Sequence, residues 1–154
     1  MMINTFSRYL FLLIFIASAA ITKAQTTSKA DRVLGKWISS ENNLIVEVYR
    51  DKNEFRGKIV WYKNEDQSKS MEEWTDKHNP DKALRSRKIL GMNVVDKLVY
   101  NSKSDSWEHG TIYDAKTGHY WDASARLTND GLLKVTGYWH LKFIGRSMTF
   151  KKAG

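Results

Sequence analysis

Two arginines in the middle of the sequence have a spacing suited to binding an anionic group. Arg85 and Arg87 are separated by one residue, so they would point the same way from an extended segment. Two neighbouring guanidinium groups repel each other unless an acid lies between them, and their geometry favours a carboxylate or a phosphate. Two interpretations stay open: the headgroup site of an anionic ligand, or a structural network in which Asp76 and Asp114 neutralise both arginines.

Aromatic residues could supply the walls of a ligand site. Tyr113 and Tyr120 flank residues 115–118, so the two side chains would oppose each other across a hairpin. Ligand sites combine such walls with a few polar anchors. The further candidates are Arg126 as an anchor and Trp61 and Trp139 as walls. Packing of these residues in a hydrophobic core is the alternative.

The segment that carries Tyr120 and Arg126 has one polar and one apolar face. Residues 120, 122, 124 and 126 share the polar face, and residues 121, 123, 125 and 127 share the other. Which of the two faces points into a barrel is left open by the sequence.

The sequence predicts no metal site, cofactor or catalytic residue. The four histidines, at positions 78, 109, 119 and 140, have no metal-ligand spacing, and no carboxylate cluster accompanies them. Serine, histidine and aspartate are present, but no nucleophile elbow organises them. An enzyme therefore ranks below a binding protein.

The N-terminus has the pattern of a cleavable export signal. Arg8 precedes a long apolar run that ends at Lys23. As a helix this run would rise only about 20 Å, against roughly 30 Å for a bilayer core. We expect cleavage before Gln25, which makes residues 1–24 the signal peptide and 25–33 a short polar leader. A permanent membrane anchor is the alternative, and no cysteine is present to accept a lipid.

Composition agrees with a small exported protein. The chain has no cysteine, so stability must come from a core supplied by six Trp, seven Tyr and six Phe. Removal of residues 1–24 lowers the formal charge of +8 by two. Acids and bases alternate in the region 63–88, which is typical of a solvated surface rather than of a nucleic-acid site. We expect a periplasmic or secreted bacterial protein that binds no nucleic acid and has no stable membrane span after cleavage.

Short aromatic and β-branched segments recur between turn residues and predict antiparallel strands. In one of them Trp61 shares a face with Phe55, Gly57 and Ile59. A polar stretch over 64–82 has no strand pattern and predicts a long loop or lid, and regular structure resumes over 83–91. The expected strands are 34–39, 44–50, 55–63, 93–100, 106–114, 119–128, 132–140 and 143–151.

About eight short strands hide their edges most simply by closing into an up-and-down barrel. We therefore predict a single all-β domain over 34–152, with a sandwich as the alternative. Gly35 and Trp37, in the first strand, have the spacing with which lipocalin-like barrels close one end. In such barrels a basic residue of the last strand covers the indole, and we expect Arg146 to do so.

Several motifs give the sequence a family resemblance that covers nearly all of residues 34–152. The most specific contains Asp76, Asn79 and Pro80, with Gly91 and Asp114 in later motifs. The full set is Leu34-Gly-Lys-Trp37, Gly57-Lys-Ile-Val-Trp61, Asp76-Lys-His-Asn-Pro-Asp-Lys-Ala-Leu-Arg-Ser-Arg87, Leu90-Gly91, Trp107-x-x-Gly110-x-Ile-Tyr-Asp114, Gly118-x-Tyr120, Leu133-Lys-Val-x-Gly137-Tyr138 and Phe143-x-Gly-Arg146.

In these motifs the chain resembles the domain of unknown function 2147 family. The resemblance implies an exported bacterial protein with a calycin-like barrel, and it carries over no activity. Two positions depart from the usual pattern, Ala115 in place of proline and Phe150 in place of tryptophan. Both are structural positions.

Three functional hypotheses follow in order. The first is a non-enzymatic barrel that binds a small amphipathic or apolar ligand, with Arg85, Arg87 and Arg126 as anchors. The second is a filled barrel that acts through its surface on an envelope protein partner. The third is an enzyme of small molecules. A cavity of several hundred Å3 would favour the first hypothesis over the second.

Overall fold

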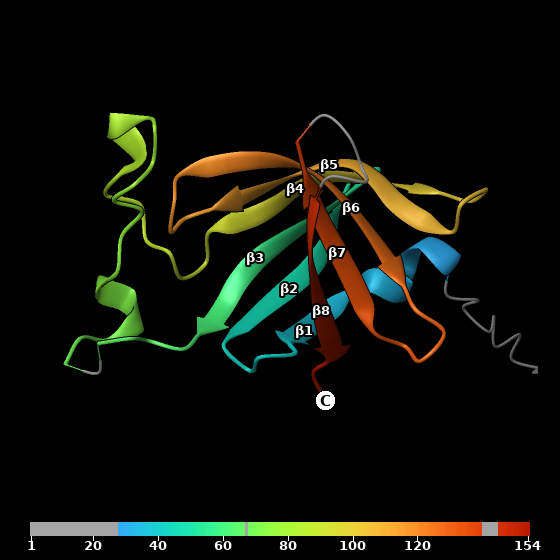
Figure 1. Ribbon diagram of the computed structural model, residues 1–154, viewed down its shortest axis with the longest axis horizontal. Helices are drawn as coiled ribbons and strands as arrows, with labels where there is room; N and C mark the ends of the chain where they lie inside the picture. The colour runs from blue at the N-terminus through green and yellow to red at the C-terminus, as the bar shows by residue number, and fades with distance from the viewer. Residues whose placement is uncertain (1–27, 67, 140–144) are drawn as a thin grey trace, which may run out of the picture.

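The computed structural model describes residues 28–66, 68–139 and 145–154 (Figure 1). Each strand pairs antiparallel with the next in the chain, and the first pairs with the last, so the sheet closes into an eight-stranded barrel. The predicted up-and-down barrel is thus confirmed, and the sandwich is excluded. The strands are β1 Gly35–Ser39, β2 Leu44–Asp51, β3 Glu54–Tyr62, β4 Asn93–Asn101, β5 Ser106–Asp114, β6 His119–Leu127, β7 Leu133–Tyr138 and β8 Gly145–Lys152.

Alternation along the strands separates a buried inner face from an outer face. On β6, Ala123 and Ala125 are buried, whereas Tyr120 and Arg126 are exposed. The sequence did not show which face of this segment points into the barrel. In the structure the apolar residues at odd positions point inward and the polar ones point outward. Arg126 therefore lies outside the barrel.

A β-bulge near the end of β3 changes which side chains point inward. Val46 pairs with Ile59, but the next residue of β2, Ile45, pairs with Trp61, so Val60 is the extra residue. The bulge turns Tyr62 onto the wall of the interior and Trp61 away from it. The prediction that Trp61 shares the inner face with Ile59 is therefore wrong.

One end of the barrel is closed by the 3-10 helix η1, Lys29–Val33 (Figure 1). The Nε1–H of Trp37 donates to the carbonyl of Val33 at 2.7 Å, and the Nε1–H of Trp107 donates to the carbonyl of Ala30 at 3.1 Å. Both indoles are almost completely buried. Each donor is thus satisfied by the helix that covers it, and the two bonds fix η1 in place.

The cation that covers Trp37 comes from the end of β8. The Nζ of Lys152 lies 4.6 Å from the Trp37 ring centre and donates to the carbonyl of Leu34. Burial lowers the pKa of Lys152. Gly35 has a φ of +108°, and an added Cβ would lie 3.3 Å from this Nζ. The predicted closure is therefore built with Lys152, and the assignment of this role to Arg146 is wrong because Arg146 lies near the start of β8, toward the other end.

A long connection joins β3 to β4 and extends beyond the barrel (Figure 1). It contains the 3-10 helices η2 Met71–Glu73 and η3 Lys82–Leu84 and an isolated bridge between Thr75 and Lys88. The predicted loop is present, but residues 83–91 form η3 followed by turns. The Asp81 side chain accepts from the Ala83 amide at 2.9 Å and so begins η3, which removes the extended geometry expected for Arg85 and Arg87.

The predicted signal peptide, residues 1–24, lies outside the described residues. Within the described ranges, no helix has the length and apolar character needed to cross a membrane.

Candidate functional site

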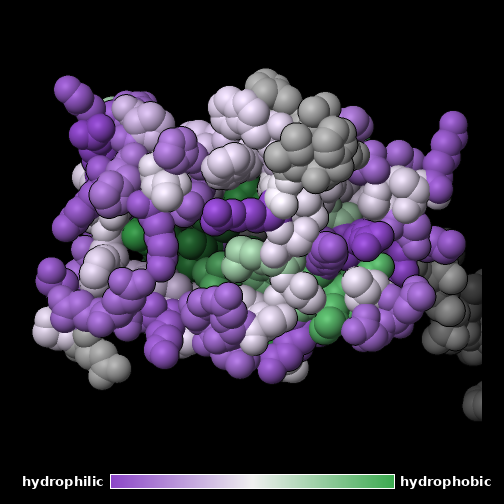
Figure 2. Space-filling view, viewed as in Figure 1, coloured by the Kyte–Doolittle hydropathy of each residue, from purple (hydrophilic) through white to green (hydrophobic). Residues whose placement is uncertain are grey.

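A cavity of about 1410 Å3 extends from the barrel interior to its open end, where the β3–β4 connection and the β5–β6 turn also line it. Its floor lies at the end closed by η1, where Val33, Trp37 and Phe150 contribute to the lining, and aliphatic side chains such as Val46 and Leu98 form its walls. Figure 2 shows hydrophobic surface at the bottom of a hollow that hydrophilic side chains surround. Ligand pockets of drug-sized molecules occupy roughly 300–1,000 Å3, so this space is large enough for one.

The cavity opens at the end where β1–β2, β3–β4, β5–β6 and β7–β8 are connected. Aromatic side chains that line this part include Tyr62, Trp74, Tyr113, Trp121 and Trp139. The rings of Trp121 and Trp139 meet edge to face with centres 6.0 Å apart, and 60% of Trp139 is exposed. Of these residues, Tyr113 and Trp139 were predicted as walls.

Trp74 carries a buried polar atom next to the cavity that its side chain lines. Its Nε1 is buried and has no hydrogen-bond partner among the described residues. Buried indole N–H groups normally find an acceptor, so this donor is an exception among the buried polar groups of the described residues. The position of Trp74 depends on the fold of the β3–β4 connection, which no periodicity in the sequence predicts.

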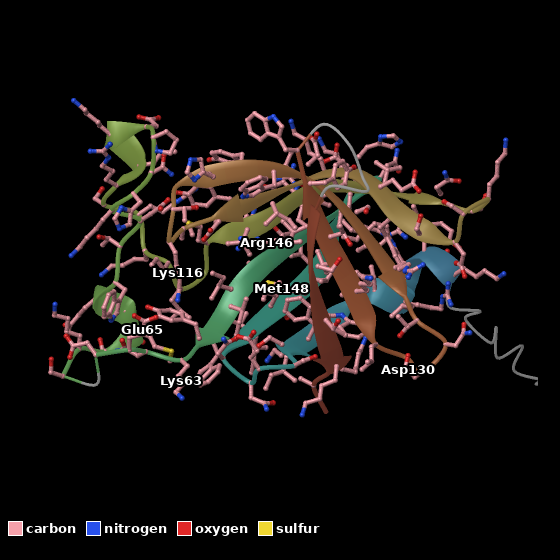
Figure 3. All side chains as sticks on the ribbon, in the orientation of Figure 1. Lys63, Glu65, Lys116, Asp130, Arg146 and Met148 are labelled. Carbon is pink, nitrogen blue, oxygen red and sulfur yellow. The ribbon has the colours of Figure 1, made fainter. Side chains whose placement is uncertain are left out.

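Basic side chains outnumber acidic ones around the cavity. The lining includes five lysines and arginines (Arg56, Lys63, Lys77, Lys116, Arg146) against two acids (Glu65, Asp114). Lys116, in the β5–β6 turn, pairs with Glu65 of the long connection at 2.9 Å. Figure 3 shows these two with Lys63 at the mouth, far from Asp130 in the β6–β7 turn at the other end. The mouth therefore favours anions over cations.

The long connection is held against the barrel by one buried carboxylate. Asp76 is fully buried and accepts three side-chain hydrogen bonds: from the Tyr113 hydroxyl at 2.5 Å, from Asn79 Nδ2 at 2.7 Å and from Arg87 Nη2 at 2.8 Å. The Arg87 guanidinium carbon also lies 5.7 Å from the Tyr113 ring centre. We call Asp76, Asn79, Arg87 and Tyr113 the docking network, because Tyr113 belongs to β5 and the others to the connection.

The charges in the docking network are set by these hydrogen bonds. Burial raises the pKa of the Asp76 carboxyl, but the bonds from Tyr113, Asn79 and Arg87 outweigh it and hold the pKa below its ordinary value. Burial and the bond to Asp76 raise the pKa of the Tyr113 hydroxyl far above its ordinary value. Tyr113 therefore remains a donor and Asp76 an acceptor at neutral pH.

The most specific motif of the sequence builds this network. The Asn79 side chain accepts from the Asp81 amide at 2.9 Å across Pro80, and the Asn79 carbonyl accepts from Arg85 Nε at 2.8 Å. The connection then packs on the β5–β6 turn so closely that a Cβ on Gly118 would lie 2.0 Å from the His78 carbonyl oxygen. The motif thus positions a loop.

The structural interpretation of the arginine pair is supported for Arg87, and the two arginines do not converge on a shared site. Arg87 pairs with Asp76, whereas Arg85 binds a backbone carbonyl, and neither lines the cavity. Asp114 does not neutralise them as predicted. Its carboxylate instead accepts from the Lys116 amide at 2.9 Å and the Thr117 hydroxyl at 2.8 Å, and so fixes the β5–β6 turn.

The remaining ligand candidates lie on the outer face of the barrel. Tyr113 and Tyr120 are cross-strand partners, so they point to the same outer side of the sheet, with ring centres 4.6 Å apart and planes tilted by 38°. Tyr113 also reaches the border of the cavity near its mouth, whereas Tyr120 is exposed. Arg126 lies in a small outer groove with Ser106, Glu108 and Lys134. Gly91 has a φ of +83° and an open surrounding, so it serves the backbone turn into β4.

No group of three or more acidic or histidine side chains capable of holding a metal ion occurs in the described part of the chain. One of the four histidines, at position 140, lies outside the described residues.

The closed barrel with one sealed end and one open end is the architecture of lipocalin-like proteins. Among solved structures the chain is similar to protein HP1028 from the human pathogen Helicobacter pylori, which is described as belonging to the lipocalin family. The two share 22% sequence identity with a TM-score of 0.67, over 79% of this chain and 83% of that chain. At this level of identity the likeness shows the fold alone.

The region that carries the sequence motifs also identifies the family of the chain. Residues 35–152 match the family described as "Uncharacterized protein conserved in bacteria (DUF2147)", so the chain belongs to this family. No curated protein matches the chain.

Proposed function

We propose that this protein binds a small amphipathic or apolar molecule inside its barrel. The observation that carries the proposal is the cavity of about 1410 Å3 with an apolar floor and walls and one open end. A barrel filled by its own side chains, as the surface-partner hypothesis requires, would leave no such space. Transfer of apolar ligand surface from water into this space supplies the driving force.

Rigid closure of the opposite end supports binding. Trp37 and Trp107 hold η1 over the floor, and the docking network holds the connection beside the mouth. A ligand would therefore meet a cavity that is already formed, which lowers the entropy cost of binding.

We further propose that binding takes place outside the cytoplasm. The apolar run before Gln25 supports export to the periplasm or the medium. The experiment is intact-mass measurement of the protein from the envelope and secreted fractions of its host, where a chain that begins at Gln25 is expected. A chain that keeps residues 1–24 would overturn the proposal that the protein is exported and cleaved.

A dye-binding experiment tests the cavity. Nile red, a neutral apolar dye, is expected to bind with increased fluorescence. Val135 lines the cavity, so Val135→Trp should fill part of it and weaken binding. Thr136, the next residue of β7, bonds to Ser147 on the outer face at 2.9 Å and provides the control Thr136→Trp. Equal binding by both variants, or absence of binding by the wild type, would contradict the proposal.

A further inference from the structure

Arg146 is a cation that projects into the barrel from a strand. It pairs with Gly137 of β7, and the next inward pairs are Met148 with Val135 and Phe150 with Leu133. Because paired residues point to the same side of the sheet, Arg146 and Met148 share the face of the lining residues, and Figure 3 shows both on one side of β8. The face of β8 thus runs from a cation near the mouth to an aromatic ring near the floor.

Arg146 has no acid or carbonyl partner in the described part of the chain. The other cations of the lining differ: Arg56 pairs with Asp51 at 3.2 Å and Lys116 with Glu65 at 2.9 Å, while Lys63 and Lys77 belong to the connection outside the strands. Its cross-strand neighbour Gly137 has no side chain that could shield it. Arg146 is therefore the cation placed directly beside the apolar part of the cavity.

An arginine in this place has a chemical consequence. Arg146 is exposed at the open end of the cavity, so its guanidinium group can be reached by an anion that enters from solution. Its five N–H donors match the two oxygens of a carboxylate or a phosphate. The distance along β8 from Arg146 to Phe150 is about 13 Å at the usual rise of a strand, which leaves room for a hydrocarbon tail below the guanidinium.

We propose that the ligand is a single-tailed amphiphile that ends in one oxyanion group, with the anion on Arg146 and the tail along Met148 and Phe150 toward Trp37. This inference rests on the proposed function and narrows it to one chemical class. A fatty acid and an alkyl phosphate share this chemistry, so the experiment includes both.

The experiment measures displacement of Nile red by dodecanoate, dodecyl phosphate and the neutral dodecanol at neutral pH. We expect at least one of the anions to compete about tenfold or more better than dodecanol, since a charge-assisted hydrogen bond discriminates by this amount. Dodecanoate and dodecyl phosphate together show which oxyanion the site prefers.

Variants of Arg146, with Arg126→Gln as a matched control, test the residue itself. Arg146→Gln should bind Nile red, which shows an intact cavity, and should lose the preference for the anion. Arg126→Gln removes an equal charge from the outer face of β6 and should keep that preference. If Arg146→Gln does not fold, Arg146→Lys keeps the charge without the paired donors and is expected to weaken the preference.

The outcomes separate the two proposals. Binding of Nile red with equal competition by the anions and dodecanol would overturn the anionic ligand and leave the cavity function standing. An anion preference that survives in Arg146→Gln would overturn the role of Arg146. Failure of Nile red and of all three competitors to bind would overturn both proposals.

Discussion

The docking network makes the stability of the long connection depend on the Tyr113 hydroxyl. Tyr113→Phe removes one of the three side-chain donors to Asp76 and leaves the ring in place. A hydrogen bond to a charged group contributes about 1.5–3 kcal/mol, and at about 1.4 kcal/mol per factor of ten this corresponds to an opening equilibrium about ten- to a hundredfold larger. Because Asp76 is fully buried, water does not replace the lost donor at no cost.

Native-state hydrogen exchange measures this opening directly. The reporters are the backbone amides of Asp76, bonded to the Arg87 carbonyl at 2.9 Å, and of Ile89, bonded to the Trp74 carbonyl at 3.1 Å. Both should exchange about ten- to a hundredfold faster in Tyr113→Phe, whereas amides of β1 and β2 should change only as far as global stability falls.

Tyr120→Phe is the matched control. It makes the same chemical change on the other ring of the tilted aromatic pair, and Tyr120 is exposed. We expect its exchange rates to match those of the wild type. Equal rates for Tyr113→Phe and Tyr120→Phe would refute the conclusion that Asp76 holds the connection to the barrel.

Three further predictions follow from the same region. The ionised Asp76 carboxylate stabilises the fold above its unfolded pKa of 3.8, and this contribution is lost as pH falls through the lower folded pKa. Asp76→Asn should therefore have a lower melting temperature than the wild type at neutral pH and should lack this loss of stability in acid. A pH profile of the melting temperature equal to that of the wild type would contradict this. Gly118→Ala combines a φ of +74° with a clash against the His78 carbonyl, so urea unfolding should show a loss of about 1–3 kcal/mol, and wild-type stability would be the contrary result. Lys116→Gln breaks an ion pair with Glu65 in which both side chains are largely exposed, so the melting temperature should not change measurably, and a clear fall would show that this pair holds the mouth.

The barrel was predictable because its strands are short, aromatic and closed by turn residues. The β5–β6 hairpin around residues 115–118 is observed as expected, with β5 ending at Asp114 and β6 beginning at His119. Hairpins depend on local turn chemistry and strand alternation, both of which the sequence displays. The order of strands then leaves few ways to hide the edges.

Strand phase was less predictable because a bulge has no clear sequence signature. One extra residue at Val60 exchanges Trp61 for Tyr62 on the cavity wall. On β6 the alternation of polar and apolar residues was visible in the sequence, but which of the two faces points inward depends on closure of the barrel. These two facts remove Trp61 and Arg126 from the site and bring in Trp121.

The role of each arginine depended on contacts that are distant in the sequence. Arg87 meets Asp76 and Tyr113 only after the connection has folded back onto β5. Arg146 faces the cavity because the register pairs it with Gly137, whereas Lys152, nearer the floor, covers Trp37. Alternation in the sequence places Arg146, Met148, Phe150 and Lys152 on one face of the last strand. Either Arg146 or Lys152 could therefore have covered the Trp37 indole, and only the register of the strands distinguishes them.

The central claim, that the barrel holds a small molecule, is tested most directly by native mass spectrometry of the mature protein purified without detergent from the envelope of its host. We expect the wild type and Thr136→Trp to carry an additional mass that is lost on denaturation, and Val135→Trp to carry less of it. A bare polypeptide mass for all three proteins, or an additional mass that Val135→Trp retains in full, would contradict a ligand in the cavity.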